Sequence, residues 1–177
     1  DRIVEENNDR DIKTYFCPRD NCSMQFIRYI KEAKETIHCA LFDLDLEELM
    51  QAFEESEADV KLVIDNENKK DTKHLSFVRF DTSSQLSHNK FCVFDENIVW
   101  TGSFNPTTRG DTVNNNNVLV VHSKNLAQNH ENEFLELWNN NFGRGSNVKY
   151  PKLKLNNILI ENYFCPEDSC AYHIIEE

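Results

Sequence analysis

The sequence predicts an α/β fold in which a mixed β-sheet is sandwiched between helices. Short apolar segments alternate with amphipathic ones in the order β-α-β-α-β, and helices of about ten or more residues between strands are typical of such folds. Two later apolar segments flank an Asp/Asn-rich turn, which predicts a hairpin. The length of 177 residues suits one well-buried domain, or one domain with part of a second.

The first half of the chain supplies three predicted strands and two predicted helices. Apolar residues at helical spacing predict an amphipathic helix over about residues 23–35. A second helix is expected over 44–56. The predicted strands are 12–17, 36–42 and 60–64. A polar loop over 65–73 follows the last of them.

The second half contains the predicted hairpin and a long helix. The hairpin pairs 88–94 with 98–102 and turns at 95–97. Ser123 is expected to cap a helix that runs to about 142, because glycines follow at 143 and 145. The remaining predicted strands are 77–80, 118–122 and 158–164.

A short internal repeat suggests how the chain is organised. Residues 15–22 read Y-F-C-P-R-D-N-C and residues 163–170 read Y-F-C-P-E-D-S-C, each at the end of a strand and before a possible helix start. We infer the front part of a duplicated protein, or a tail that is exchanged between copies. The predicted parts are a flexible lead-in over 1–11, a domain over 12–145, a linker over 146–157 and the start of a second, truncated repeat over 158–177.

The composition is that of a soluble globular chain, with 39% hydrophobic and 28% charged residues. No apolar run approaches the roughly 18 to 20 residues of a membrane span, so no transmembrane segment is expected. The formal net charge of −12 argues against broad, nonspecific attraction to nucleic acid or to anionic membranes. A small local basic pocket remains compatible with that charge.

The polar residues most indicative of chemistry stand at fixed offsets between residues 87 and 121. His88, Lys90 and Asp95 form H-x-K-x4-D, and after six residues a G-S-x-N segment follows with Ser103 and Asn105. On a strand, residues two apart point to the same face, which would pair the imidazole with a fixed positive charge. The full spacing, H-x-K-x4-D-x6-G-S-x-N, resembles the core motif of the phospholipase D superfamily without departure, and the chain is most similar to its small bacterial endonucleases.

This resemblance implies a phosphodiesterase that works through a phosphohistidine. His88 would attack phosphorus, Lys90 and Asn105 would hold the phosphoryl oxygens, and Ser103 would hydrogen-bond nearby, so that catalysis needs no metal or other cofactor. Asp95 falls at the hairpin turn, where we expect it mainly to bind backbone amides.

Two features of the chain set it apart from a complete site of this family. Relatives carry an N-x-E-N type segment whose Glu hydrogen-bonds the motif His, whereas Asn116 stands in that slot here. An amide can orient an imidazole but cannot stabilise its charged form, so reduced activity is expected. The family also uses two facing motif copies, and this chain contains one. The second His is therefore expected from a homodimer partner or from a further part of the chain.

The six cysteines leave alternatives open. Cys39 and Cys92 lie inside apolar strands and are expected to be buried small hydrophobic residues. For the two C-x4-C pairs, local disulfides, free thiols and one shared structural zinc site all remain. The residues concerned are Cys17, Cys22, Cys165 and Cys170.

Three functions follow from the motif. The first is hydrolysis of DNA or RNA, most simply as single strands, and the second is hydrolysis of a phospholipid such as cardiolipin. The third is a weakened, non-catalytic member that binds or scaffolds, which Asn116 favours and the intact His88, Lys90, Ser103 and Asn105 oppose. The charge of −12 and the lack of an aromatic and basic strip along the sequence count against nucleic acid.

Overall fold

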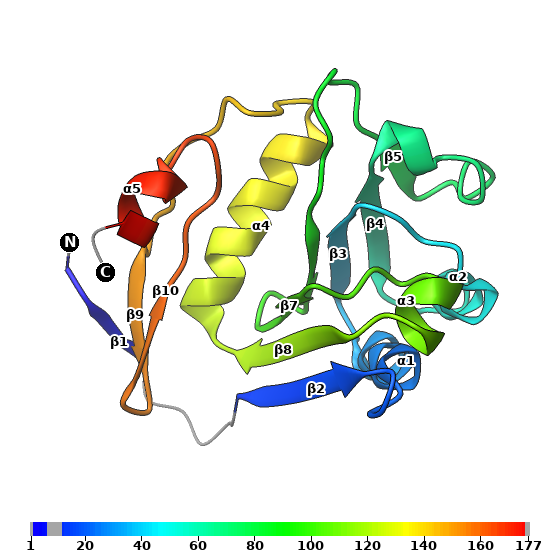
Figure 1. The fold of residues 1–177 in the computed structure, drawn as a ribbon, viewed down its shortest axis with the longest axis horizontal. Helices are drawn as coiled ribbons and strands as arrows, with labels where there is room; N and C mark the ends of the chain where they lie inside the picture. The colour runs from blue at the N-terminus through cyan, green and yellow to red at the C-terminus, as the bar shows by residue number, and fades with distance from the viewer. Residues whose placement is uncertain (1, 7–11, 176–177) are drawn as a thin grey trace.

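A seven-stranded mixed sheet forms the centre of the molecule (Figure 1), with strand order β2-β8-β7-β6-β3-β4-β5. The structure is a computed structural model that describes residues 2–6 and 12–175. β3, β4 and β5 run parallel, and the other neighbours are antiparallel, so the predicted mixed sheet is confirmed. The strands are β2 Lys13–Cys17, β3 Thr36–Leu41, β4 Asp59–Ile64, β5 Val78–Phe80, β6 Lys90–Phe94, β7 Ile98–Gly102 and β8 Asn116–His122.

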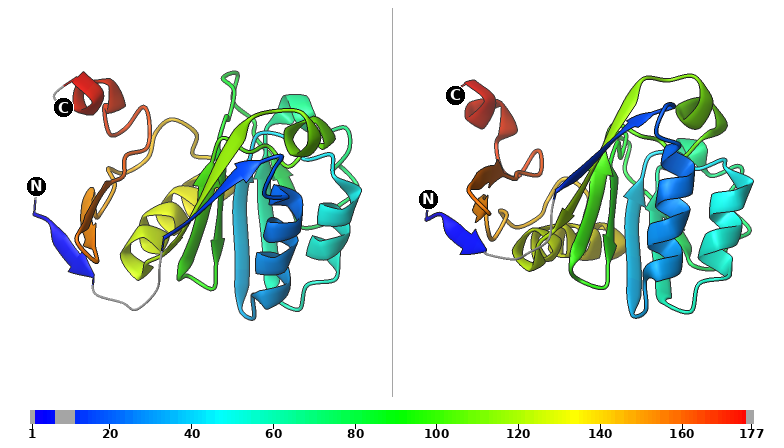
Figure 2. Two further views of the ribbon diagram at one scale, coloured as in Figure 1. Left: turned by 60° about the horizontal axis from the view of Figure 1, so that its bottom comes forward. Right: turned by 90° about the horizontal axis from the view of Figure 1, so that it is seen from below.

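Helices cover both faces of this sheet, as Figure 2 shows. α1 (Cys22–Glu32) and α2 (Glu47–Glu54) lie on one face, and α4 (Lys124–Trp138) lies on the other. Under α1, the buried Phe26 ring stacks on Trp100 with 4.7 Å between centroids. Under α4, Phe134 is fully buried. None of the described helices has the length and apolar character that a membrane crossing requires.

Polar side chains fix where these helices begin. The Ser123 hydroxyl accepts a hydrogen bond from the Leu126 amide at 3.1 Å. Ser123 is thus the N-cap that the sequence predicts. α1 follows Asn21, which makes no side-chain cap. Asp111 supplies the cap from a distance, since its carboxylate accepts from the Ser23 amide at 3.0 Å and the Ser23 hydroxyl at 2.9 Å.

The β6–β7 hairpin turns where the sequence predicts. Asp95 and Glu96, the first two of the three residues that connect β6 to β7, have φ values of 50° and 49°, both left-handed as in a type I′ turn. The Asp95 carboxylate accepts from the amides of Lys34, Glu35 and Thr36 at 2.7 to 3.1 Å. The expected role of Asp95 in binding backbone amides is confirmed, and this residue ties β6 to the start of β3.

A second, three-stranded sheet was not predicted. Its order is β1-β9-β10, from β1 (Val4–Glu6), β9 (Lys152–Leu155) and β10 (Ile158–Glu161). Within the expected linker over 146–157, residues 152–155 form β9, and its Leu153 and Leu155 are buried in a core that they share with α4. The alternation K-L-K-L is the two-residue period of a strand. In the expected lead-in, residues 4–6 form β1, while 1 and 7–11 lie outside the described residues.

The cysteines form three disulfides, namely Cys17–Cys22, Cys39–Cys92 and Cys165–Cys170. Cys39 and Cys92 are buried as expected, but the expectation of two separate hydrophobic residues is wrong, because they are cross-strand partners in β3 and β6. The two C-x4-C pairs take the disulfide alternative. In this arrangement the four sulfurs are paired in disulfides rather than present as the thiolates that a shared zinc site would need.

The sequence repeat is also a repeat of local structure. In the first copy the Asp20 carboxylate accepts from the Phe16 amide at 2.7 Å, and in the second Asp168 accepts from Phe164 at 2.7 Å. Each copy leads into a helix that begins at its second cysteine, α1 in the first and α5 (Cys170–Ile175) in the second. The expected helix start after the second copy is confirmed.

Candidate active site

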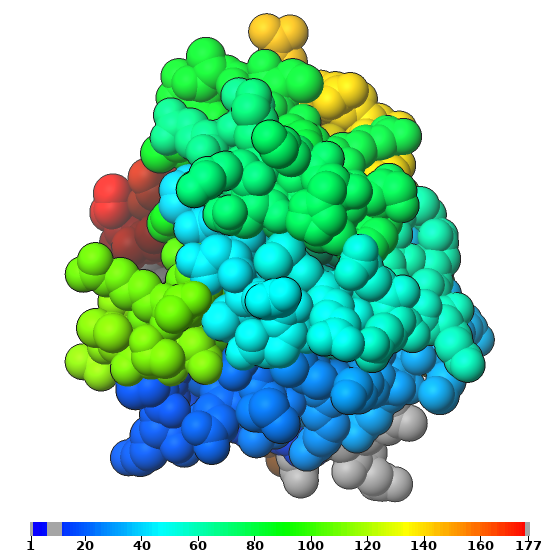
Figure 3. Space-filling view, turned by 90° about the vertical axis from the view of Figure 1, so that its right-hand side faces the viewer, coloured from blue at the N-terminus to red at the C-terminus, as the bar shows by residue number. Residues whose placement is uncertain are grey.

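One end of the large sheet collects the motif segments. β7 is antiparallel to both β6 and β8, with Phe91 opposite Thr101 and Gly102 opposite Val118. The end of β7 therefore meets the starts of β6 and β8. Figure 3 looks onto the side where the segment around α3 (Thr108–Thr112) lies against the first turns of α1. Residues from three separate stretches thus share one edge of the molecule.

His88 lies just before β6, which begins at Lys90 rather than at the predicted residue 88. Its ring is exposed and contacts Phe42 edge-to-face, with 4.6 Å between centroids. The Lys90 ammonium donates to the His88 carbonyl at 3.0 Å and lies 5.1 Å from the Phe42 ring centroid. The imidazole and the ammonium are thus held side by side, with Phe42 packed against both.

The surroundings shift the pKa of both groups. Partial burial and then the charge of Lys90 lower the pKa of His88, and Asp65 opposes this effect. Burial lowers the pKa of Lys90 to about 8. At neutral pH His88 is therefore mostly the neutral imidazole that a nucleophile requires, while Lys90 still carries its charge.

Sequence reasoning missed two residues that position His88. The buried Asp65 carboxylate accepts from the Ser87 amide at 2.7 Å and from the Glu67 amide at 2.9 Å, which fixes the backbone just before His88. Phe42 follows β3 and contacts the ring. Each of the two residues follows an apolar strand, which is only a weak sign of a role at the site. The order of the strands in the sheet brings them to His88, and that order cannot be read from neighbouring residues.

The close approach of the β8 backbone requires glycine at the first position of the G-S pair. Gly102 has φ +143°, and a Cβ there would lie 2.4 Å from the Asn117 carbonyl oxygen. The Ser103 amide donates to that oxygen at 3.0 Å, and the Asn117 amide donates to the Ser103 hydroxyl at 3.0 Å. These contacts fix Ser103 beside the start of β8.

Asn116 is held next to Ser103. Its Oδ1 accepts from the Ser103 hydroxyl at 3.3 Å, and its Nδ2 donates to the Gly110 carbonyl at 3.1 Å. The expected contact of this amide with the motif His is not what the structure shows, since among the described hydrogen bonds these two engage the Asn116 side chain. Asn116 thus positions Ser103 and the α3 segment.

Asn105 lies in the segment between β7 and α3. Its Oδ1 is buried and has no hydrogen-bond partner among the described residues. An unpaired buried amide oxygen is costly, and such groups call for an explanation at the place where they occur. Asp45 anchors this segment, because its carboxylate accepts from the Thr108 amide at 2.6 Å.

Asp95 stands apart from these residues. It follows the last residue of β6, whereas Lys90 is the first, so the two are separated by the length of the strand, about 16 Å. The structure brings together His88, Lys90, Ser103, Asn105 and Asn116 at one end of the sheet, and leaves Asp95 at the other as a structural residue.

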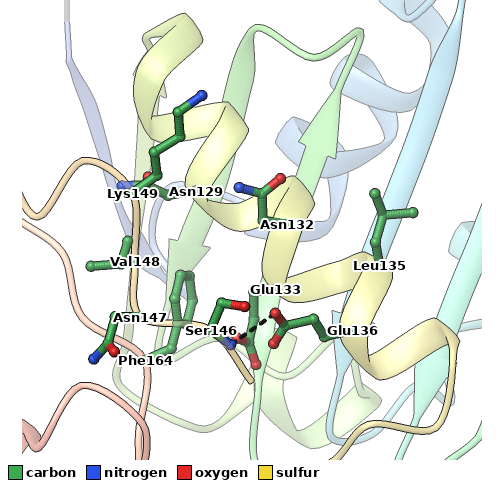
Figure 4. A pocket seen from close by; sticks show the side chains of 10 residues that line it. All are labelled: Asn129, Asn132, Glu133, Leu135, Glu136, Ser146, Asn147, Val148, Lys149 and Phe164. Atoms are coloured by element: carbon green, nitrogen blue, oxygen red, sulfur yellow. Dashed lines mark hydrogen bonds between the residues drawn. The ribbon is translucent and has the colours of Figure 1, made fainter. Parts of the chain in front are cut away.

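Two hollows lie on the α4 side of this end. One, of about 620 Å³, extends from His88 and Asn89 to α4 and residues 163–167, and its wall includes the carboxylates of Asp81, Glu133 and Glu167. The other, of about 200 Å³, contains no motif residue. In Figure 4, Glu133 and Glu136 point from α4 toward Ser146, whose amide donates to Glu136 at 3.0 Å. No group of three or more His, Cys, Asp or Glu side chains in the described ranges is placed to hold a metal ion.

Glu133 gives a prediction about stability. Burial, followed by the charges of Glu167, Glu136 and Asp168, raises its pKa to about 7. The folded protein therefore binds more protons than the unfolded chain between about pH 4.5 and 7, so stability falls as pH rises through that window. Replacing Glu133 with Gln should raise the unfolding free energy at pH 8 by at most about 3 kcal/mol relative to wild type, and the melting temperature should rise with it. At pH 5 the gain should be small.

Thermal unfolding at the two pH values checks this prediction. The exposed Glu57, changed to Gln, provides the matched control, and its difference from wild type should not vary with pH. A Glu133→Gln variant with the same difference from wild type at both pH values would contradict the predicted role of burial.

Comparison with known proteins extends the likeness beyond the motif. The family described as "Cardiolipin synthase, PLD-like domain" matches residues 26–138, more than half of the chain. The phospholipase D of Rickettsia typhi is 25% identical over 146 residues, which cover 76% of this chain and 70% of that protein. The mitochondrial cardiolipin hydrolase of Xenopus tropicalis is 38% identical over 61 residues, 34% of this chain and 29% of that protein.

Solved structures show the same fold. Nuc from Salmonella typhimurium, a phospholipase D family member, superposes with a TM-score of 0.63 at 24% identity, covering 76% of this chain and 95% of Nuc. NucT from Helicobacter pylori superposes with a TM-score of 0.57 at 15% identity, covering 73% of this chain and 98% of NucT. The family match over residues 26–138 includes the whole stretch from His88 to Asn116, so the chain belongs to the phospholipase D superfamily.

Proposed function

We propose that this protein hydrolyses phosphodiesters through a covalent intermediate on His88, with nucleic acid as the substrate. The observation that carries the proposal is the convergence of His88, Lys90, Ser103 and Asn105 at one end of the sheet. A phosphodiester resists attack because its anionic oxygens repel nucleophiles, so a catalyst needs a nucleophile, an acid and positive charge.

The proposed reaction has two displacements. A neutral imidazole nitrogen of His88 attacks phosphorus, the bond to the leaving oxygen breaks, and that oxygen takes a proton from a second His. The second His then removes a proton from water, which attacks the phosphohistidine and releases His88. The Lys90 ammonium and the Asn105 amide hold the phosphoryl oxygens, and Ser103 is positioned by Asn116 and Asn117.

The second His belongs to another copy of the motif. The sequence contains one H-x-K-x4-D, so in this proposal a homodimer partner or a further part of the chain supplies the acid. A homodimer places the two copies around a twofold axis, and each His88 then serves as the acid for the other's intermediate.

Phospholipid hydrolysis is the second candidate. Relatives named phospholipase D and mitochondrial cardiolipin hydrolase favour it. So does the hollow beside His88, whose wall also carries the apolar side chains Leu86, Leu137, Phe142 and Phe164. A weakened member that only binds is the remaining alternative, since Asn116 offers no carboxylate to support a charged imidazole.

Turnover in the presence of EDTA tests the proposal. The purified protein and a His88→Ala variant are assayed on bis(p-nitrophenyl) phosphate, a single-stranded oligonucleotide and cardiolipin vesicles. We expect His88-dependent hydrolysis of the first two. Cleavage of the vesicles alone would establish the phospholipid candidate, and equal inertness of both proteins on all three substrates would leave only the binding role.

The pKa of Lys90 predicts the alkaline limb of the activity. As pH rises through about 8, Lys90 loses the charge that would stabilise the phosphoryl oxygens, so kcat/KM on bis(p-nitrophenyl) phosphate should fall. In Lys90→Arg the charge persists, and the fall should move to higher pH even if the rate is lower throughout. An alkaline limb at the same pH in both proteins would show that another group titrates.

A further inference from the structure

A shallow pocket of about 460 Å³ adjoins the Ser103 side of the site. Residues 16–19 at the end of β2 and residues 115–117 at the start of β8 line it. The two segments are about a hundred residues apart in the sequence and meet because β2 is the edge strand paired with β8. Figure 3 shows the segment before β8 above the blue N-terminal segment. No described residue of the motif other than Asn116 belongs to the pocket.

The pocket is connected to the reacting groups through the sheet. Phe16 is the cross-strand partner of Asn117, and Asn117 exchanges backbone and side-chain hydrogen bonds with Ser103. Lys90 lies three strand spacings away from Phe16, across β7 and β8, or about 14 Å. A substrate held at both places must extend well beyond the scissile phosphate.

The side chains of the pocket suit a ligand group that is an uncharged aromatic ring with polar atoms along its edge. Phe16 is 51% exposed, which leaves ring surface open to solvent. Asn115 and Asn117 are exposed beside it, and their amides offer both donors and acceptors. The Arg19 side chain is 80% exposed, and its 3.6 Å contact with Asp20 is a surface pair that holds it weakly.

Charge separates this pocket from the hollow on the other side of His88. No carboxylate lines the pocket of Phe16, and Arg19 belongs to it. The hollow beside His88 carries Asp81, Glu133 and Glu167. A polyanionic strand that passes the site is therefore favoured on the Phe16 side and repelled on the other.

The exposure of Phe16 is not a property of the repeated segment. The matching residue of the second repeat, Phe164, is held by the same hydrogen bond to an aspartate. Its ring, however, packs against Phe91 and His130, at 6.1 Å and 5.1 Å between centroids. Phe16 lies in β2, and the turn that follows it is fixed by the Cys17–Cys22 disulfide and by Asp20, so its ring is presented on a rigid support.

We propose that Phe16 is a stacking platform for a base of a single-stranded nucleic acid whose phosphodiester lies at His88. Asn115 and Asn117 hydrogen-bond to the edge of that base, and Arg19 contacts its phosphate. This proposal rests on the proposed function and names its substrate as a single strand. Stacking on one aromatic side chain accounts for roughly 5-fold to 150-fold in binding.

Three variants test the platform. Phe16→Ala should raise the Kd of a fluorescently labelled single-stranded oligonucleotide, measured by anisotropy, about 10-fold, and should raise its KM by a similar factor. Phe16→Trp keeps an aromatic face and should restore both values. Tyr172→Ala removes an aromatic side chain of similar exposure, 57%, from α5, and should leave binding and turnover at wild-type values.

The outcomes separate this inference from the proposed function. If bis(p-nitrophenyl) phosphate is hydrolysed in a His88-dependent way while Phe16→Ala binds the oligonucleotide as wild type does, the platform is overturned and the phosphodiesterase stands. The same holds if the wild type fails to bind the strand but cleaves cardiolipin vesicles. Binding that depends on Phe16, in a protein without turnover, would overturn the catalytic proposal and support the platform. Unfolding curves of Phe16→Ala distinguish a lost platform from a lost fold.

Discussion

Replacing His88 with alanine should lower the turnover of bis(p-nitrophenyl) phosphate by about 10³-fold or more, because it removes the atom that would form the covalent intermediate. The fold should survive the change. The side chain is exposed, and its described ring contact is the edge-to-face contact with Phe42, worth about 1 kcal/mol. Loss of activity with an unchanged melting temperature would therefore assign a chemical role to His88.

The matched control is another exposed histidine. His74 is exposed in the loop between β4 and β5, which β3 separates from β6 in the sheet, and His74→Ala should keep wild-type turnover. Rapid mixing of the wild type with substrate should also release a burst of p-nitrophenol if hydrolysis of the phosphohistidine is slow. A His88→Ala variant with more than a tenth of wild-type activity would contradict nucleophilic catalysis by this residue.

Local chemistry explains what could be predicted from the sequence. The hairpin and its turn follow from Asp95 and its neighbours, and the start of α4 follows from the Ser123 cap. The motif offsets place His88 and Lys90 at the beginning of one strand and Ser103 at the end of the next, so their proximity follows from a single hairpin. These features depend on residues that are close in sequence.

The features that the sequence did not predict depend on strand order. Phe42 and Asp65 meet His88 because β3 lies between β6 and β4. Phe16 meets Asn117 because β2 joins the sheet at the far side of β8. The presence of an aromatic residue near the site could therefore not be predicted from the sequence, which contains no aromatic and basic strip. The disulfide between Cys39 and Cys92 was not predicted for the same reason, since each cysteine looks like an ordinary strand residue in the sequence.

The Cys39–Cys92 disulfide should stabilise the fold more than the Cys17–Cys22 disulfide does. It joins residues 53 apart, whereas Cys17–Cys22 spans 5. A longer closed loop removes more entropy from the unfolded chain, which predicts losses of about 4 and about 2 kcal/mol when each pair is changed to alanine. For a chain of this size the first loss lowers the melting temperature by about 10 °C.

The position of this disulfide links stability to the site. Cys92 lies two residues after Lys90 on β6, and Cys39 lies three residues before Phe42, so the bond joins β3 and β6 directly beneath the contact of Phe42 with His88. Reductant should therefore lower both the melting temperature and the turnover of wild type, and should change the Cys39→Ala, Cys92→Ala variant less. Equal unfolding curves with and without reductant, or two reactive thiols at these positions in the native protein, would contradict the pairing. Because disulfides persist in oxidising compartments, protein produced under reducing conditions should resemble the less stable variant.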